Sequence, residues 1–304
     1  MRAETTSHEP TLSKVQACSL LLAYCLIYVL PLHIYRPARA SPERSRDDPI
    51  AIRARIRAVS VSTAACSCVT FVLLSTYAAP WRLMGYWPCG LQETVQILCL
   101  TATLFAAPLY EYIIIDGAWS EWLHLRPLRL LQHDWPTWRN LVAGPITEEC
   151  LFRSASVPLL LAAGYSISAT IFLSPLVFGL AHIHHFYEFR KTNPGVHVGA
   201  AVARSVLQFS YTYLFGVYAT FIFLRTGSTL AAIAAHAFCN SMGLPRVWGS
   251  VEPYWLLEGA PAHLQGEEQK LWTVGYYVLL FGGMAAFYCA LFPLSVSDLA
   301  LESF

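Results

Sequence analysis

Long apolar stretches separated by short polar segments dominate the chain. A membrane-spanning helix needs about 20 mostly apolar residues, and on that criterion the pattern predicts eight spans. The fourth, fifth and seventh are weaker, because each is short or carries ionisable side chains. The predicted fold class is therefore all-α, a polytopic integral membrane helical bundle of about eight transmembrane helices. The predicted spans are Val15–Tyr35, Ala58–Ala79, Gln92–Ile115, Leu141–Ala163, Ser166–His185, Val202–Leu224, Ser228–Leu244 and Leu271–Leu294.

Arginine and lysine are distributed unevenly between the loops on the two sides of these spans. The loops after spans one, three, five and seven hold fourteen of them, four lie on the opposite side, and two lie within spans. Positively charged loops face the cytosol in most membrane proteins. We therefore expect the arginine-rich loop 36–57 in the cytosol and both termini on the far side. We interpret this loop as an orientation signal rather than a site for nucleic acid or lipid headgroups.

The composition agrees with a membrane protein and argues against several other classes. Of the 304 residues, 56% are hydrophobic and only 13% are charged, against about 25% charged in a typical soluble domain. The high apolar content excludes a disordered chain, and a net charge of +1 leaves no basic excess for nucleic acid. Eight of the nine cysteines fall in apolar stretches and no CxxC pair occurs. Neither a disulfide framework nor a zinc finger is therefore indicated.

Two glutamates and an arginine stand in the fourth predicted span, in the segment Pro145–Arg153. An ionisable group at a helix centre costs about 2.5–3.5 kcal/mol on insertion scales, so such groups mark candidate functional sites. Glu149 and Arg153 are four residues apart and can pair on one helix face, whereas Glu148 lies about 100° away around the helix. We predict that Glu149 and Arg153 form a structural ion pair and that Glu148 is free to act as a base. One structural network of all three is the alternative.

Two further polar clusters interrupt apolar spans. The segment His182–His185 holds three histidines, of which the last two are interpreted as interfacial and His182 lies deeper. His236 and Asn240 are four residues apart in the seventh span and so share a helix face. Under the expected orientation these clusters and Glu148 lie at a similar depth in the cytosolic half of the membrane. This coincidence predicts one catalytic chamber that faces the cytosol.

Glutamate, histidine and asparagine side chains at one depth suit hydrolysis. A carboxylate and an imidazole can activate water, and an imidazole and an amide can donate hydrogen bonds to a developing oxyanion. Cys150 and Cys239 each face about 100° away from the neighbouring acid or histidine and are interpreted as packing residues. A zinc site of Glu148, His182 and His236 remains open, although the HExxH helix of zinc proteases is absent.

Three motifs follow one another on three predicted spans: EExxxR at Glu148–Arg153, FxxxH at Phe178–His182 and HxxxN at His236–Asn240. Together they resemble the type II CaaX prenyl endopeptidases, the Ras-converting enzyme family of glutamate-type intramembrane proteases. The segment Gln208–Gly216 also resembles the eukaryotic members. The similarity covers roughly Leu141–Gly243, about a third of the chain. EExxxR alone is a weak signal, whereas the three motifs in order are a specific one.

The resemblance implies an endopeptidase that removes the last three residues, aaX, from prenylated CaaX proteins. The implied substrates are farnesylated or geranylgeranylated proteins such as Ras-type small GTPases. Family members are usually multi-pass proteins of the endoplasmic reticulum membrane with a site open to the cytosol. The resemblance also implies a metal-free mechanism without a cofactor.

Motif by motif, the resemblance assigns a role to each candidate residue. It implies Glu148 as the base that activates water, with His182 as its partner. It implies His236 and Asn240 as oxyanion donors, supported by the Glu149–Arg153 pair. These roles agree with the division between the two glutamates that follows from helix geometry alone.

Other function classes remain open. A proton-coupled transporter could use buried glutamate and histidine as relays, but no matching halves are seen. A membrane acyltransferase could use histidine and asparagine, but the Glu-Glu-Arg cluster would have no role, and intact motifs argue against a catalytically silent scaffold. We divide the chain into residues 1–140 with the N-terminal spans and the arginine-rich loop, 141–244 with the catalytic core, and 245–304 with the C-terminal loop and last span.

Overall fold

The computed structural model describes residues 12–39, 45–257 and 262–302. Within these ranges every regular element is helical, which confirms the predicted all-α class. Arg2 and Arg44, two of the arginines used to predict the orientation, lie outside the described residues.

The long α-helices are α1 (Lys14–Ile34), α2 (Pro49–Leu73), α4 (Leu91–Leu104), α11 (Ile167–Leu180), α13 (Val198–Thr226), α14 (Thr229–Met242) and α16 (Ala262–Ala290). The short α-helices are α3 (Pro80–Leu83), α5 (Ala106–Tyr110), α6 (Trp119–Leu123), α7 (Arg126–His133), α8 (Trp135–Trp138), α9 (Gly144–Glu149), α10 (Val157–Ala162), α12 (His184–Thr192) and α15 (Tyr254–Leu257). The π-helical segments are η3 (Glu111–Ile115), η4 (Arg139–Ala143) and η5 (Cys150–Ala155), and the 3-10 turns are η1 (Arg36–Ala38), η2 (Leu74–Thr76) and η6 (Pro293–Ser295).

The turn between α13 and α14 depends on glycine. Gly227 has a φ of +57°, in the left-handed region that favours glycine at a helix end. A Cβ at this position would meet the carbonyl oxygen of Leu299 at 2.0 Å. Ser228 then begins α14, because its hydroxyl accepts the N–H of Ala231 at 3.0 Å. This tight reversal sets the position along the bundle at which α14 presents His236.

Six of the eight predicted spans correspond to helices that are long and apolar enough to cross a membrane. Five are continuous, and the sixth is the pair Leu91–Leu104 and Ala106–Ile115, which bends by 83°. The multi-pass character is therefore confirmed. The continuous helices are Lys14–Ile34, Pro49–Thr76, Ile167–Thr192, Val198–Thr226 and Gly266–Ala290.

The fourth and seventh predicted spans are not regular spanning helices. Residues 139–162 alternate between π-helix and α-helix through η4, α9, η5 and α10. Helix α14 has 14 residues, about 21 Å at 1.5 Å per residue, which is shorter than an apolar membrane core of about 30 Å. The count of eight transmembrane helices is therefore not confirmed. Both irregular elements carry candidate site residues.

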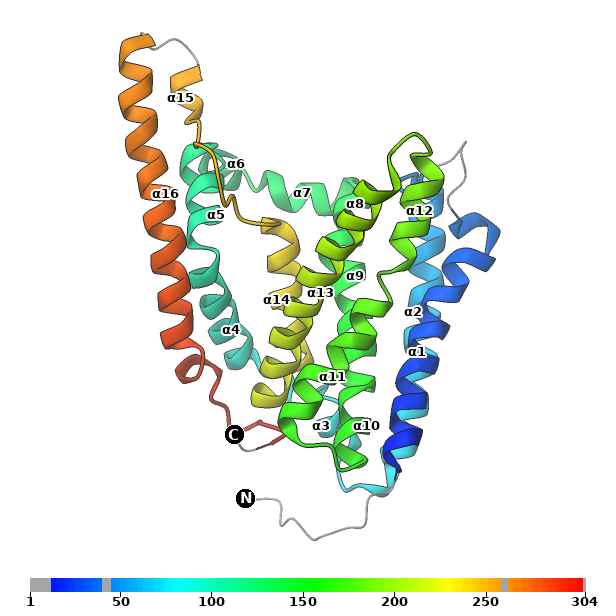
Figure 1. The fold of residues 1–304 in the computed structure, drawn as a ribbon. Coiled ribbons are helices and arrows are strands. Elements are labelled where there is room, and N and C mark those ends of the chain that lie inside the picture. Colours follow the sequence, from blue (N-terminus) through cyan, green and yellow to red (C-terminus); the bar gives the residue numbers. More distant parts are fainter. Residues whose placement is uncertain (1–11, 40–44, 258–261, 303–304) are drawn as a thin grey trace.

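The site elements lie between two flanks of the bundle (Figure 1). On one flank α1 packs along α2, and on the other α16 packs along α4 and α5. Between them α11 packs along α13, while α14 contacts α4, α9 and α13. Helices α7, α8 and α12 lie toward the end of the bundle at which α1 ends and α2 begins. The described arginines of loop 36–57 lie at this same end.

Hydroxyl groups of the first flank hold the irregular segment 139–162 in place. Tyr28 of α1 contacts the hydroxyl of Thr147 at 3.1 Å, and Thr63 of α2 donates to the carbonyl of Thr147 at 3.2 Å. Thr70 of α2 donates to the carbonyl of Ala155 at 2.9 Å. Backbone groups that leave the α-helical pattern need other partners in a membrane. These side chains satisfy two of those carbonyls and thereby position the glutamates of α9.

Candidate active site

A buried ion network forms the centre of the site. Arg153 Nη1 donates to Glu149 Oε1 at 3.2 Å, and Arg153 Nε lies 3.1 Å from Glu149 Oε2 as an ion contact without hydrogen-bond alignment. The predicted i,i+4 pair is thus present. The structure adds a third member, because His236 Nδ1 lies 2.7 Å from Glu149 Oε1. All three side chains are buried. We call Glu149, Arg153 and His236 the inner network.

Aromatic rings and a backbone carbonyl complete the surroundings of Arg153. Its guanidinium lies 4.5 Å from the ring centroid of Phe178 and 5.7 Å from that of Phe215. Its Nη2 donates to the carbonyl of Gly216 at 3.5 Å. Cation–π contacts stabilise a desolvated guanidinium, and its partner Glu149 supplies the countercharge. The arginine is therefore held rigidly and serves to orient Glu149.

Glu148 lies outside this ion pair, as the helix geometry predicts. Its side chain is 19% exposed, and its Oε2 lies 3.8 Å from His236 Nε2. His236 therefore stands between the two carboxylates, with Nδ1 on Glu149 and Nε2 toward Glu148. Of the two acids, only Glu148 has an exposed part of its side chain, since Glu149 is 0% exposed.

His182 lies in the turn that joins α11 to α12. Its Nδ1 is 2.9 Å from the carbonyl oxygen of Phe178, and a carbonyl can only accept, so Nδ1 carries the proton in this contact. The neutral ring then presents an unprotonated Nε2. The ring also packs edge-on against Phe178, with centroids 4.8 Å apart. His182 is thus held in an orientation that offers a proton acceptor.

Asn240 lies one helical turn beyond His236 on α14. Its Nδ2 donates to the carbonyl oxygen of Asn140 in η4 at 2.9 Å. An amide NH₂ has two donor hydrogens, so one remains for a ligand. Cys239 lies beside it and lines the same cavity. The cavity therefore extends over more than one face of α14.

An apolar cavity of about 810 Å³ brings the predicted residues together. Its wall is formed by α11, α13, α14, α16 and the C-terminal end of α4. Three of the polar side chains on this wall are His182, His236 and Asn240, so two motifs separated by more than fifty residues share one chamber. Glu148 adjoins the chamber through His236. The apolar lining residues include Leu104, Phe105, Ile171, Phe172, Phe178, Leu214, Phe215, Val217, Tyr218, Phe221, Leu244, Phe287 and Leu291.

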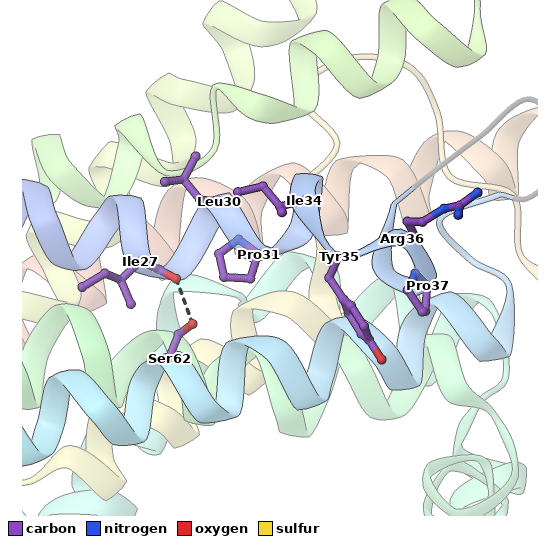
Figure 2. A pocket seen from close by; sticks show the side chains of 8 residues that line it. All are labelled: Ile27, Leu30, Pro31, Ile34, Tyr35, Arg36, Pro37 and Ser62. Atoms are coloured by element: carbon purple, nitrogen blue, oxygen red, sulfur yellow. Dashed lines mark hydrogen bonds between the residues drawn. The ribbon is translucent and has the colours of Figure 1, made fainter.

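A second groove of similar size shows that volume alone does not identify the site. It lies between α1 and α2, measures about 890 Å³, and has neither an acid nor a histidine among its lining residues (Figure 2). The dashed line in Figure 2 is the hydrogen bond from Ser62 Oγ to the carbonyl of Ile27, at 2.8 Å, which ties the two helices together. Its polar side chains are those of Tyr35, Arg36 and Ser62, and we assign it no catalytic role. It is lined by Ile27, Leu30, Pro31, Ile34, Tyr35, Arg36, Pro37 and Ser62.

Comparison with known proteins gives a consistent answer. The sequence model of the family described as "Type II CAAX prenyl endopeptidase Rce1-like" matches residues 132–242, the range that holds all three motifs. The chain is 36% identical over 265 residues to "Probable CAAX prenyl protease 2" of Schizosaccharomyces pombe, and the match covers 87% of this chain and 89% of that protein.

The chain belongs to the Rce1-like family of type II CAAX prenyl endopeptidases. It is also 32% identical over 264 residues to "CAAX prenyl protease 2" of Arabidopsis thaliana, covering 79% of this chain and 83% of that protein. The same name is carried by a Homo sapiens protein that is 33% identical over 256 residues, covering 76% of this chain and 71% of that protein. No solved structure matches the chain. The resemblance inferred from the motifs is confirmed, and the chain is a membrane peptidase.

The proposed zinc ligands do not meet in the described part of the chain. The group there whose ligand atoms lie within 4.8 Å of one another is His184, His185 and Glu188, and it does not include the set Glu148, His182 and His236. Even this group is a poor cation site, because Glu188 is already paired with Arg55.

Two contacts of the site were not expected from the sequence. The Glu149–His236 hydrogen bond joins residues 87 positions apart, and the Asn240–Asn140 hydrogen bond joins residues 100 positions apart. No periodicity connects such positions. In the sequence, Asn140 stands out only as a polar residue just before the apolar stretch that leads to Glu148.

Proposed function

We propose that this peptidase cleaves the bond that follows the prenylated cysteine of CaaX proteins and so releases the tripeptide aaX. The observation that carries the proposal is the apolar cavity with His182, His236 and Asn240 on its wall. Its volume of about 810 Å³ lies in the range of sites that bury small molecules. A prenyl chain could lie against the aromatic wall while the adjoining peptide bond meets the polar groups. The names of the relatives support the same substrate class.

In the mechanism we propose, Glu148 and His182 activate a water molecule. Glu148 is the acid left out of the ion pair, and His182 offers an unprotonated Nε2. Glu148 takes a proton from the water while the water oxygen attacks the scissile carbonyl. The same proton then passes to the nitrogen of the departing tripeptide as the C–N bond breaks. The prenylated cysteine becomes the new C-terminus.

The contacts of His236 set a condition on its proposed role as oxyanion donor. Its Nδ1 is directed at Glu149, so Nε2 can donate a hydrogen bond only when both ring nitrogens carry protons. With His236 protonated, two carboxylates face one imidazolium and one guanidinium. Asn240 supplies a second donor through its remaining N–H.

We further propose that the enzyme resides in the endoplasmic reticulum membrane with its site accessible from the cytosol, and that Ras-type GTPases are among its substrates. The excess of arginine and lysine in the loops after odd-numbered spans supports this orientation. Helix α9, which carries Glu148, and the turn between α11 and α12, which carries His182, approach the end of the bundle at which α1 ends and α2 begins. The described arginines of loop 36–57 lie at that end. Tags on the two ends of the chain, tested for protease protection in sealed microsomes, would establish the orientation.

The decisive experiment is mass spectrometry of CaaX peptides after incubation with the purified full-length protein in lipid. A farnesylated or geranylgeranylated peptide should lose its last three residues, and the identical unprenylated peptide should not. The variant Glu148→Gln, which keeps the size of the side chain, is the matched inactive control. Equal cleavage of prenylated and unprenylated peptide would refute the proposed substrate class.

A chelation experiment separates the proposed mechanism from a zinc mechanism. A strong chelator should leave the rate unchanged. If the chelator abolishes activity and Zn²⁺ restores it, His236 is a metal ligand and not an oxyanion donor.

A further inference from the structure

Arginines gather at one edge of the site, beyond the histidines of the segment His182–His185. Arg46, in the turn that precedes α2, has its Nη1 3.3 Å from His185 Nδ1. Arg46 and Arg139 approach the same carboxylate oxygen of Asp47, at 3.8 Å and 2.7 Å. A second acid, Glu188 of α12, lies 3.8 Å from Arg46 and pairs with Arg55 of α2. We call the set Arg46, Arg55, Arg139, Asp47 and Glu188 the outer cluster.

The outer cluster has one more guanidinium than carboxylates. Arg55 and Glu188 form a close pair in which both side chains are buried, and Arg139 hydrogen-bonds Asp47. Arg46 stays 3.8 Å from either acid, beyond the hydrogen-bond range of about 2.7–3.2 Å. Partial burial and the neighbouring Arg139 lower the pKa of the Arg46 guanidinium, against the opposing influence of Glu188. An anion bound to Arg46 would stabilise the charged guanidinium against these effects.

The distance from Arg46 to the hydrolytic residues is within the reach of a tripeptide. The ring centroids of His182 and His185 are 5.7 Å apart, and His185 Nδ1 is 3.3 Å from Arg46 Nη1. Arg46 Nη1 therefore lies no more than about 10 Å from the centre of the His182 ring, and three extended residues at about 3.4 Å each can span that distance. A CaaX substrate has three residues between the bond that is cleaved and its terminal carboxylate.

We infer that Arg46 binds the C-terminal carboxylate of the substrate and thereby sets which peptide bond lies at Glu148 and His182. The inference rests on the proposed function, since it assigns a subsite to the same substrate. A guanidinium can hold a carboxylate through two parallel hydrogen bonds. The side chain of Arg46 is 37% exposed, so it is accessible to an incoming chain end.

This assignment gives the two ends of the substrate opposite surroundings. The prenyl group lies in the apolar cavity lined by α11, α13, α14 and α16. The free carboxylate lies on the outer cluster, next to α2 and α12. A protein with a longer C-terminal tail would carry its carboxylate past Arg46 and lose this contact. Arg46 therefore explains how an endopeptidase would release a tripeptide of fixed length.

The test uses two farnesylated CaaX peptides that differ only at the C-terminus, one a free acid and one an amide. They are assayed with the full-length wild-type protein and with the variants Arg46→Gln and Arg46→Lys. Arg53→Gln is the matched control. Arg53 is an exposed arginine at the start of α2 that contacts the carbonyl of Pro49 and the ring of Trp135, both outside the outer cluster. Thermal unfolding of each protein monitors folding.

We expect the wild type to prefer the acid over the amide by about 10- to 100-fold in kcat/KM, the range for one charge-assisted hydrogen bond. Arg46→Gln should lose a similar factor on the acid, mainly through KM, and should leave the amide nearly unchanged. Arg46→Lys should recover part of the preference, and Arg53→Gln should behave as the wild type. The inference is overturned if the wild type does not prefer the acid, or if Arg46→Gln lowers both peptides equally.

Binding measurements separate a failure of this inference from a failure of the proposed function. The same two peptides are titrated against the same proteins by thermophoresis, which needs no turnover. If the wild type cleaves neither peptide but binds the acid selectively through Arg46, the carboxylate site stands and the proposed reaction fails. If binding shows no dependence on Arg46, the inference fails whether or not cleavage occurs.

Discussion

The inner network and the outer cluster both combine arginine with carboxylates, and in each region one group stays outside the close ion pairs. Beside the inner network, Glu148 lies outside the Glu149–Arg153 pair, with His236 at 3.8 Å. In the outer cluster two acids serve three arginines, and Arg46 lies outside the close pairs. The group outside the pairs differs, and so does the chemistry it can perform: a carboxylate accepts a proton, and a guanidinium holds an anion. In each region we propose that the paired groups fix the geometry and the group outside the pairs acts.

Burial separates the Glu149–Arg153 pair from the Asp47 side of the outer cluster. Glu149 and Arg153 are essentially inaccessible, with side chains 0% and 1% exposed, whereas Asp47 in the outer cluster is 55% exposed. Removing one partner of a buried pair strands a charge and costs about 3–5 kcal/mol, whereas an exposed pair contributes about 0–1 kcal/mol. The comparison therefore predicts that substitutions in the two regions change different properties of the protein and differ in the size of their effects.

The largest effect on activity is expected from Glu148→Gln. The change removes the proposed base but keeps the shape of the side chain, so turnover should fall by about 10³–10⁴-fold, the upper part of the range for general-base catalysis. The melting temperature should stay close to that of the wild type, because Glu148 is not part of the Glu149–Arg153 pair. Single-turnover kinetics on a prenylated peptide measure the first quantity. A well-folded Glu148→Gln protein with full activity would disprove the assignment.

Glu149→Ala should instead act mainly on folding. It strands both Arg153 and His236, and we expect a loss of stability of about 3–5 kcal/mol, seen as a low yield of folded protein. The measurement is the recovery of monodisperse protein from detergent together with its thermal unfolding. If Glu149→Ala were as stable as Glu148→Gln, the distinction between the two glutamates would be wrong.

Asn240→Ala should fold normally and slow turnover by about 10²–10³-fold, the range for losing one oxyanion donor. The loss should appear in kcat without a change in the shape of the pH–rate profile, because an amide does not titrate. His182→Ala is the informative comparison, since losing a group on the base side should change the profile as well as the rate. A shifted profile for Asn240→Ala would contradict the donor role.

The smallest effect is expected from Asp47→Asn in the outer cluster. Removing this exposed carboxylate should change stability by less than about 1 kcal/mol. It leaves Arg46 with fewer competing anions, so KM for a free-acid peptide should fall by about two- to five-fold, which corresponds to an exposed pair of about 0.5–1 kcal/mol. The amide peptide should show no change. A higher KM for the acid would indicate that Asp47 supports Arg46 instead of competing with the substrate.

The spans that agreed with the sequence and those that did not differ for a physical reason. Helices such as α1 and α16 carry many exposed apolar side chains, so a continuous apolar run suffices to predict them. The stretch 139–162 and α14 are surrounded by other helices, which supply hydrogen bonds and aromatic walls. Such surroundings permit π-helical turns and a short helix, and neither leaves a mark in a hydropathy pattern.

Some contacts of the candidate site could also be predicted from the sequence, and others could not. The i,i+4 spacing of Glu149 and Arg153 and the shared face of His236 and Asn240 follow from helix geometry, so these pairs could be predicted. The hydrogen bond between Glu149 and His236 could not be predicted, because it depends on how α14 packs on α9.

By itself the sequence determined that the chain is an all-helical, multi-pass membrane protein with three ordered motifs of one peptidase family. It also determined which glutamate could pair with Arg153, because both lie on one helix and the helical repeat is a local property. Only the tertiary structure decided that His236 stands between the two glutamates, that His182, His236 and Asn240 line one cavity, and that Arg46 lies beside His185. Those relations join residues far apart in the chain, and they exist only once the helices have packed.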